Sequence, residues 1–300
     1  MTKVWCPGHI TGFFEIYKSD DTRYMGSRGA GVCISKGVET DLTIIENKEI
    51  EINIKINGKS VYAPVTHSVV EHFQKLINNS LSFMIEHEIE VPISAGFGSS
   101  GAGALSTAIA LNEELGLNMS RNSIATIAHV AEVENSTGLG DVIAQTHGGV
   151  EIRIEPGAPG IGRIDQIITD PNLKLICMSI GKLETKTIIT DPAYQERINR
   201  VGRILIKELL QNATIKNFIK LSKKFMEETG LLSERLKDLI IYIEDSLSLP
   251  TSMVMLGESL FTFVKKTECD EVRDKIQEYS PKLNVFSCEI DYRGPRIIEV

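Results

Sequence analysis

The sequence predicts an α+β protein of two domains, on the basis of three observations. Its 300 residues exceed the commonest size of a single domain. Strand and helix patterns occur in both halves of the chain, and those of the first half indicate a mostly antiparallel sheet. Residues 155–162 hold two prolines and three glycines, which is typical of a linker. We therefore expect domains at residues 1–158 and 159–300.

The composition is that of an ordinary globular protein, with 42% apolar and 24% charged residues. A formal net charge of −8 argues against nucleic acid as a partner, because nucleic-acid binding relies on basic patches. Five scattered cysteines argue against a zinc site or a disulfide framework and fit a reducing compartment. The sequence has no long apolar run and no signal core, so we expect a cytoplasmic protein without a membrane partner.

The N-terminal segment predicts a short strand over residues 3–6 that ends at a Pro-Gly pair. Just past this pair lie a histidine, a threonine and a carboxylate, at His9, Thr11 and Glu15. These side chains are candidates for contact with a substrate. An ordinary strand–turn–strand explains the same pattern equally well.

Residues 26–31 predict a glycine-rich bend with Arg28 at its centre. An arginine in such a bend is usually solvated or ion-paired, but it is also suited to hold an anion. Strand patterns follow at residues 42–45 and 50–56, and the Asn-Gly pair after them indicates a hairpin turn. We expect its return strand at residues 61–65 and an amphipathic helix beyond it.

In residues 92–106, glycines alternate with small residues, and a helical apolar pattern follows. Glycine lets the backbone approach a ligand closely, and the start of a helix attracts anions. Ser99 and Ser100 add hydroxyl groups that can cap the helix or bind a phosphate-bound metal. We therefore interpret this stretch as a phosphate-binding loop.

Three better-known glycine loops are excluded. No lysine occurs between Lys75 and Lys174, so the Gly-Lys-Ser/Thr end of a P-loop is missing. Residues 96–101 match G-x-G-x-x-G, but a helix continues where the dinucleotide fingerprint requires a strand and an acidic residue. The downstream motifs of protein kinases are absent. A glycine-rich turn that only caps a packing helix remains the alternative.

The next expected helix begins near Ser120, and three carboxylates lie at its end or just beyond it. Glu132 and Glu134 are at the helix end, and Asp141 lies past a Gly-x-Gly turn. Carboxylates beside phosphates bind magnesium and accept protons. A single acidic residue at a helix end is usually solvated. For Asp141, which stands between that turn and a strand over residues 148–154, we favour a functional role.

The second half predicts a strand over residues 173–180 and three helices within 192–247. Residues 250–261 combine small residues and methionines ahead of another expected helical stretch. A helix near residues 270–279 and a strand over 284–290 complete a second α+β layer.

With these motifs in place, the chain resembles the GHMP kinase superfamily of galactokinase and homoserine, mevalonate and phosphomevalonate kinases. Residues 6–15 are similar to its N-terminal motif and residues 92–102 to its phosphate loop. Residues 131–141 resemble the segment with its magnesium-binding glutamate and substrate-facing aspartate. The resemblance implies a ribosomal protein S5 domain 2-like N-terminal domain and a ferredoxin-like C-terminal domain.

The sequence departs from the usual family pattern at two places. Many relatives have lysine where His9 stands, and residues 252–257 keep one glycine of the family's Gly-Ala-Gly-Gly-Gly motif. The variation is similar to that of archaeal-type pantoate kinases, which phosphorylate the 4-hydroxyl of pantoate with ATP on the route to coenzyme A. Other GHMP kinases, acting on mevalonate, shikimate or homoserine, and a non-catalytic GHMP-fold binding protein are the alternatives. A homodimer is left open.

The resemblance implies ATP and Mg²⁺ as cofactors and a small molecule as substrate. It assigns Asp141 to the acceptor hydroxyl, and Ser100 and Glu132 to magnesium, as the three catalytic residues. The residues expected at the ATP phosphates are Pro92, Gly96, Gly98, Ser99, Ser100, Gly101 and Ala102. The residues expected at the substrate are His9, Thr11, Glu15, Arg28 and Arg153.

A bidentate arginine fits a planar carboxylate best, so an arginine is expected at the acidic end of the substrate. We favour Arg153 over Arg28, because strand alternation puts Arg153 on the face opposite its apolar neighbours, twelve residues beyond Asp141. The alternative is that Arg153 only pairs with Glu151 or Glu155.

Overall fold

The computed structural model describes residues 1–46, 50–77, 80–181 and 192–300. The strands of the first sheet are β1 (Thr2–Tyr17), β2 (Gly26–Glu46), β3 (Ile52–Ile56), β4 (Lys59–Ser60), β5 (Leu81–Ile89), β6 (Val150–Glu155), β7 (Arg163–Ile167) and β12 (Arg296–Glu299). They run in the order β12-β1-β2-β5-β3-β4, with β6 beside β2 and β7 beside β6. Within the described residues, β3 with β5 is the one parallel pair of this sheet.

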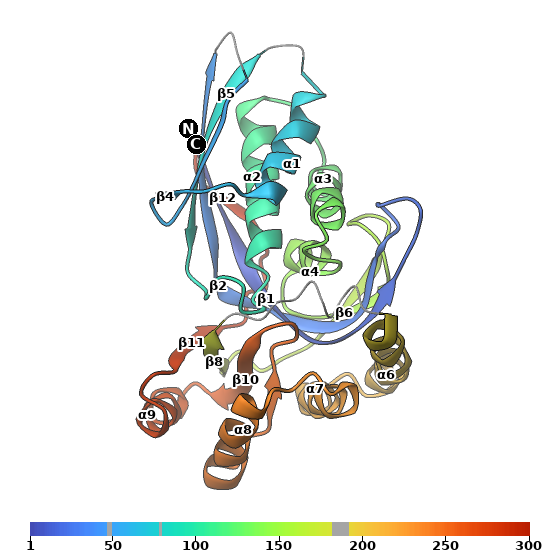
Figure 1. The fold of residues 1–300 in the computed structure, drawn as a ribbon, viewed down its shortest axis with the longest axis vertical. Coiled ribbons are helices and arrows are strands. Elements are labelled where there is room, and N and C mark those ends of the chain that lie inside the picture. The colour runs from blue at the N-terminus through green and yellow to red at the C-terminus, as the bar shows by residue number, and fades with distance from the viewer. Residues whose placement is uncertain (47–49, 78–79, 182–191) are drawn as a thin grey trace.

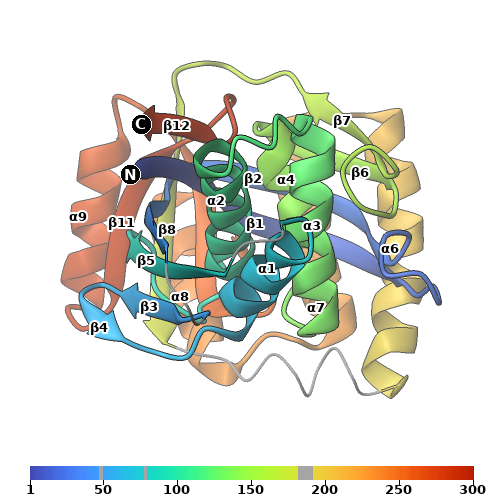
Figure 2. The ribbon, with the colours of Figure 1, turned by 90° about the horizontal axis from the view of Figure 1, so that it is seen from above.

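Helices cover one face of the first sheet (Figures 1 and 2). They are α1 (Pro64–Gln74), α2 (Ser99–Glu114), α3 (Arg121–Glu134) and α4 (Asp141–His147). The buried side chains of Phe83 on β5 and Leu105 on α2 belong to the core between the layers. On β5, Phe83 and Ile85 are buried whereas Met84 between them is exposed, as alternation along a strand requires.

The second sheet lies below the first in Figure 1. Its strands are β11 (Asn284–Glu289), β8 (Leu173–Gly181), β10 (Glu258–Lys265) and β9 (Thr251–Met253), in this order across the sheet. Its helices are α6 (Pro192–Gln211), α7 (Ile215–Thr229), α8 (Glu234–Leu247) and α9 (Cys269–Tyr279). A second core joins these elements to the first sheet, where the Phe13 ring centroid lies 6.4 Å from those of Phe218 and Phe225.

The observed fold confirms the expected α+β class, but several local predictions are wrong. The first strand does not end at the Pro-Gly pair, because a shift of register between Pro7 and Gly8 keeps both residues within β1. Residues 26–31 lie within β2 and form no bend. The expected return strand at 61–65 is replaced by β4 and by α1, because Pro64 stands at the first position of that helix.

Two further differences lie close to the motifs. Asp141 does not precede a strand directly, since it opens the short helix α4. The helical stretch expected after Gly257 is strand β10, which forms a hairpin with β9. The first sheet also continues through β7 past residue 158 and takes in the C-terminal strand β12. The division at residue 158 stays a prediction.

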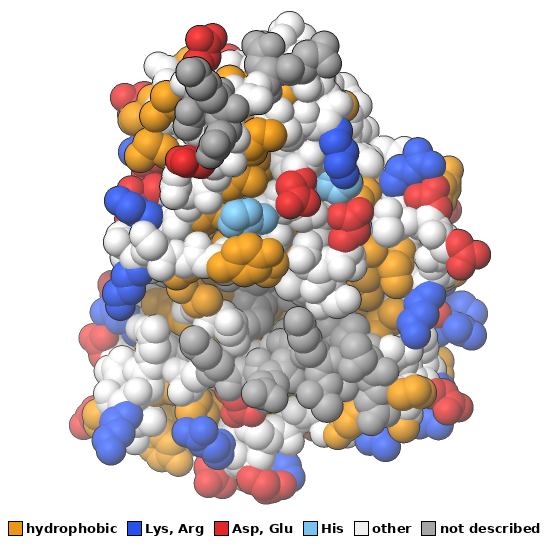
Figure 3. Space-filling view, turned by 45° about the horizontal axis from the view of Figure 1, so that its top comes forward, with side chains coloured by type: hydrophobic (Ala, Val, Ile, Leu, Met, Phe, Trp, Pro, Cys, Tyr) orange, Lys and Arg blue, Asp and Glu red, His pale blue; other side chains and the backbone are white. Residues whose placement is uncertain are grey.

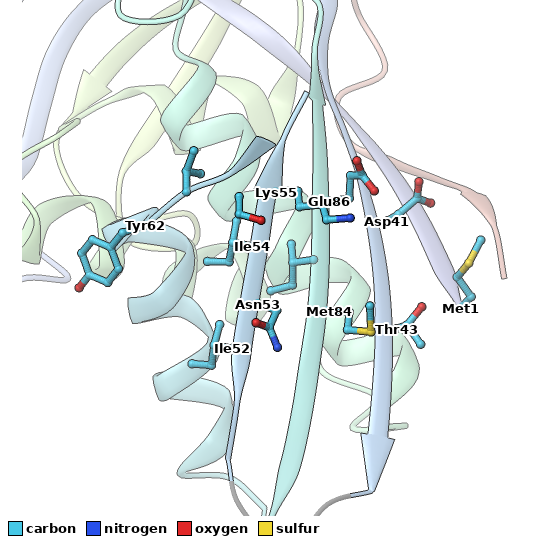
Figure 4. Close-up of a pocket in the computed structure, with 13 residues that line it drawn as sticks. Met1, Asp41, Thr43, Ile52, Asn53, Ile54, Lys55, Tyr62, Met84 and Glu86 are labelled. Carbon is cyan, nitrogen blue, oxygen red and sulfur yellow. The ribbon is translucent and has the colours of Figure 1, made fainter. Parts of the chain in front are cut away.

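A pocket of about 660 Å³ lies on the face of the first sheet turned away from α1 and α2 (Figure 4). Asp41 and Thr43 from β2 and Met84 and Glu86 from β5 are among the side chains that line it. None of the residues expected at the active site is among them. This pocket is therefore separate from the candidate site.

Candidate active site

The predicted phosphate loop connects β5 to α2. Gly96 and Gly98 have φ angles of +89° and +63°, a conformation that favours glycine. Gly98 is the N-cap of α2, and no side chain of the described residues caps it there. The first N–H groups of this 16-residue helix and the positive end of its dipole are thus suited to an anion.

The turn between β9 and β10 brings the second sheet into contact with the loop. A Cβ atom on Gly257 would lie 1.9 Å from the carbonyl oxygen of Ala95, so only glycine fits there. The backbone N–H of Met255 donates to the carbonyl of Thr11 at 3.1 Å. The turn that carries the single glycine of the atypical third motif therefore contacts both the loop and the N-terminal motif.

Ser100 and Glu132 are in contact, as the family resemblance implies. The Ser100 hydroxyl donates to Glu132 Oε1 at 2.5 Å, and the Thr137 hydroxyl donates to the same oxygen at 2.8 Å. Glu132 is 1% exposed, and burial raises the pKa of its carboxyl group to about 7 against the opposing effect of the Ser100 hydrogen bond. Its other oxygen, Oε2, is buried and has no hydrogen-bond partner among the described residues.

An orphaned carboxylate oxygen beside a serine hydroxyl is a donor set that fits Mg²⁺, which prefers hard oxygen ligands. The described residues hold no group of three or more His, Cys, Asp or Glu side chains arranged for a metal. Further ligands would therefore come from phosphates and water. Glu134, the rival candidate, instead bonds His72 Nε2 at 2.9 Å and the Ser68 hydroxyl at 3.0 Å, away from Ser100.

Asp141 stands close to this pair. A Cβ atom on Gly138 would lie 2.2 Å from Glu132 Oε2 and 3.2 Å from Asp141 Oδ2, so both carboxylates border the same glycine. A Cβ atom on Gly101 of α2 would lie 3.1 Å from the Asp141 Cβ. The helix start, the metal candidate and the catalytic candidate thus meet in one place.

His9 is fully buried behind Asp141. Its Nδ1 lies 2.6 Å from Asp141 Oδ1, and its Nε2 lies 2.9 Å from Glu151 Oε1. Burial lowers the pKa of His9, but hydrogen bonds to Asp141 and Glu151 outweigh burial and raise this pKa above its usual 6.5. The structure therefore brings His9 to Asp141, the candidate catalytic residue, and leaves none of the His9 surface exposed to a substrate.

Arg153 forms the ion pair with Glu151 that the sequence left open. Its Nε is buried without a hydrogen-bond partner in the described chain. A Cβ atom on Gly140 would lie 2.8 Å from this Nε and 2.2 Å from the Ser27 hydroxyl. Ser27, Thr11 and Asp141 line a neighbouring cavity of about 50 Å³. Arg153 thus reaches the surroundings of Asp141 with one donor unused.

Glu15 and Arg28 lie elsewhere. They face each other across β1 and β2, on the side of the sheet opposite Ser27, because successive residues of a strand point to opposite faces. Arg28 Nη1 is 3.4 Å from Glu15 Oε2, and Arg203 Nε donates to Glu15 Oε1 at 2.9 Å. All three line an open pocket of about 1000 Å³ that does not include Asp141.

Sequence reasoning named Glu151 only as a partner of Arg153, and did not select Ser27 or Thr137. The sequence does carry a signal for the ion pair. Glu151 and Arg153 are charged residues on one face of a strand whose other face is apolar, and this pattern indicates a buried ion pair. Ser27 and Thr137 carry no such signal, because single hydroxyl residues near glycines are common in turns.

On the face shown in Figure 3, the described acidic and basic side chains are scattered among apolar and uncharged groups. Among the helices of the described residues, none is long and apolar enough to cross a membrane.

Comparison with known proteins agrees with this geometry. Residues 64–149 match the family described as GHMP kinases N terminal domain. The pantoate kinase of Methanocaldococcus jannaschii is 40% identical over 96% of this chain and 100% of its own length. The pantoate kinase of Thermococcus kodakarensis is 35% identical over 99% of this chain and 98% of its own length.

Solved structures show the same fold. A protein described as "Phosphotransferase related to CoA biosynthesis pathway" is 32% identical, with a TM-score of 0.90, over 99% of this chain and 98% of its own. The homoserine kinase of Cytophaga hutchinsonii, at 16% identity, shares the fold with a TM-score of 0.73 over 99% of this chain and 97% of its own.

The fold and the glycine loop at the start of α2 define a GHMP kinase, the class that the three motifs predict. Within that class, the chain belongs to the pantoate kinase family, since it matches these relatives along nearly its whole length.

Proposed function

We propose that the chain transfers the terminal phosphoryl group of ATP to the 4-hydroxyl of pantoate and forms 4-phosphopantoate for coenzyme A biosynthesis. The full-length identity of 40% to a pantoate kinase carries this proposal. The meeting of Ser100, Glu132 and Asp141 beside the glycine loop supports it, because a non-catalytic binding protein has no need of this set. Relatives that act on homoserine share only the fold with this chain.

Phosphoryl transfer spreads negative charge over the transferred oxygens, so catalysis consists mainly of positioning and electrostatic stabilisation. In the proposed complex, the backbone N–H groups of residues 96–102 and the start of α2 bind the ATP phosphates. The turn at Gly257, beside the second sheet, packs against the loop and keeps it in place.

Ser100 and Glu132 would hold Mg²⁺, with the buried Glu132 Oε2 as the free ligand atom. When bound, the metal would offset the negative charge of the phosphates. In this proposal, Ser100 and Glu132 bind the metal ion and fix its position.

Asp141 receives the acceptor hydroxyl in this proposal. The hydroxyl O–H bond breaks and its proton passes to the Asp141 carboxylate, while the oxygen forms a bond to the terminal phosphorus and ADP departs. The hydrogen bond from His9 fixes the orientation of the carboxylate for this step. Thr11 and Ser27, which line the same cavity, are suited to bind the remaining polar groups of the acceptor.

Arg153 is the proposed ligand of the substrate carboxylate. Its buried Nε lacks a partner among the described residues and lies close to Ser27 and Gly140. Arg28 is the weaker candidate, because it engages Glu15 on the opposite face of the sheet. We further propose a cytoplasmic location, which fits five free, buried cysteines.

Purified protein supplied with Mg²⁺ and ATP should consume ATP when pantoate is added. Mevalonate, shikimate and homoserine serve as matched acceptors, and we expect far lower turnover with each of them. Equal or faster turnover of any of the three would refute the substrate assignment and leave the family assignment intact.

A further inference from the structure

Glu151 is a buried carboxylate to which none of the motifs assigns a role. It lies on β6 with no exposed surface. Its Oε1 accepts hydrogen bonds from His9 Nε2, at 2.9 Å, and from Arg153 Nη1. Its Oε2 is buried without a hydrogen-bond partner in the described residues. One carboxylate oxygen therefore connects two side chains of the proposed site.

His9 extends this connection to Asp141. Both of its ring nitrogens face carboxylate oxygens, which only accept hydrogen bonds. A neutral imidazole carries one N–H and can satisfy one of them, whereas an imidazolium satisfies both. The geometry thus favours the charged ring, with its Nδ1–H donated to Asp141 and its Nε2–H to Glu151.

Arg153 and Cys33 also face His9, and the charge of the Arg153 guanidinium opposes that of the ring. Arg153 approaches Nε2 at 3.5 Å from β6 and pairs with Glu151, so two carboxylates surround two cations. Cys33 on β2 is paired with His9 on β1, and burial raises the pKa of its thiol, which keeps the thiol uncharged.

The chain makes room for this arrangement with a glycine. Gly31 on β2 is paired with Glu151, and a Cβ atom there would lie 2.3 Å from His9 Nε2 and 2.6 Å from Glu151 Oε1. A side chain at residue 31 would therefore displace the hydrogen bond between His9 and Glu151. The glycine-rich segment that looked like a bend serves the contact between these two charged groups.

We propose that Glu151 is a positioning residue that holds both halves of the site through one carboxylate: His9, which orients Asp141, and Arg153, which faces the acid group of the substrate. This inference rests on the proposed function. Glu151 itself touches neither the reacting hydroxyl nor the phosphates. Its loss should therefore impair catalysis and substrate binding together, whereas loss of either neighbour should impair mainly one of them.

The test is steady-state kinetics of Glu151→Gln, which keeps the shape of the side chain and removes its charge. We expect kcat to fall about 10- to 100-fold and the KM for pantoate to rise about tenfold, since hydrogen bonds between charged groups are lost on both sides. The KM for ATP should stay unchanged. The matched control is Glu155→Gln, four residues along the same strand, where the carboxylate is exposed and pairs with Arg163.

The pH profile separates a positioning role from a merely structural one. Without the Glu151 charge the imidazolium of His9 is less stable, so the alkaline limb of kcat should move to lower pH. His9→Gln should lower kcat with little change in the KM for pantoate. The double variant should lose less in kcat than the product of the two single losses, because both act on Asp141.

Should Glu151→Gln fail to fold, Glu151→Asp keeps the charge but retracts it by one methylene, and the same shifts are expected in smaller size. Kinetic constants and an alkaline limb equal to those of Glu155→Gln would overturn the proposal, as would a loss of thermal stability alone. Absence of pantoate turnover in the unmodified protein would instead refute the proposed function. In that case an NMR titration of His9 still tests the role of Glu151, since its pKa should drop in Glu151→Gln.

Discussion

Two of the buried histidines, His9 and His87, have contrasting surroundings. His9 stands among charged groups, with Asp141, Glu151 and Arg153, and we call these four residues the charged cluster. His87 on β5 stands among hydroxyl groups, and we call it and its partners Thr40, Thr66 and Ser106 the hydroxyl cluster.

The surroundings shift the pKa values of the two histidines in opposite directions. Burial acts on both rings and disfavours the cation. Around His9 the two carboxylates reverse this effect, whereas around His87 the hydroxyl groups do not, and burial lowers the pKa of His87 to about 4. In this chain, the histidine with charged partners lies at the candidate site, and the histidine with hydroxyl partners lies between the first sheet and helices α1 and α2.

The largest expected effect comes from the charged cluster. Asp141→Asn keeps the shape of the side chain but removes the charge that orients and deprotonates the acceptor. We expect kcat to fall by roughly 10²–10⁴-fold, as for other positioned acid–base groups. Nucleotide binding, measured by calorimetry, should be retained. Retained turnover in Asp141→Asn would contradict the assigned role.

Next in size is the loss of the proposed carboxylate ligand. Arg153→Ala should lower kcat/KM for pantoate by roughly 10- to 150-fold, since a charge-assisted hydrogen bond contributes about 1.5–3 kcal/mol. Arg153→Lys should also be impaired, because lysine lacks the planar fork. Arg28→Ala, on the other face of the sheet, is the control. A normal KM for pantoate in Arg153→Ala would transfer the assignment to Arg28.

A somewhat smaller effect is expected at the proposed magnesium site. Glu132→Gln should raise the Mg²⁺ concentration needed for half-maximal activity by at least about 10- to 100-fold, since loss of a group that only supports a metal ligand already has an effect of that size. Glu134→Gln is the control, because Glu134 bonds His72 and Ser68 instead. The assignment is wrong if Glu134→Gln is the crippling change and Glu132→Gln is silent.

The smallest effect belongs to the hydroxyl cluster and concerns stability. His87 is neutral in the folded state down to a pKa of about 4, whereas an unfolded histidine titrates near 6.5. Between these values the unfolded state binds more protons, so stability declines as pH falls. Between pH 7 and pH 5, we expect His87 to lower the free energy of unfolding by about 2 kcal/mol. Urea unfolding of the wild type and His87→Gln at both pH values measures it, and equal pH dependence in the two would contradict it.

The part of the site that binds phosphate was largely predictable, because the glycine loop and its helix are formed by residues close together in the sequence. Ser100, Glu132 and Asp141 could be selected by the family resemblance, and the structure brings them together. The charged cluster could not be predicted from local pattern, since His9 and Glu151 are 142 residues apart and meet only when β6 pairs with β2.

The errors in the fold have a similar cause. Residues 26–31 are rich in glycine because neighbouring backbone lies close to Gly26 and Gly29, and the side chains of His9 and Glu151 lie close to Gly31. A local pattern interprets such glycines as a bend. Likewise, apolar and polar residues alternate only weakly after Gly257, and this stretch forms a strand because it pairs with β8 and β9. Tertiary packing thus overrides local preference at the places that build the site.

The most direct test of the central claim is the position of the transferred phosphoryl group. Phosphorus-31 NMR of the product from pantoate and ATP distinguishes the two hydroxyls, since the 4-hydroxyl is on a CH₂ group and the 2-hydroxyl on a CH group. We predict a phosphomonoester signal split into a triplet by two protons, formed by the wild type and not by Asp141→Asn. A doublet, or a product that forms equally well in Asp141→Asn, would contradict the proposed function and its site.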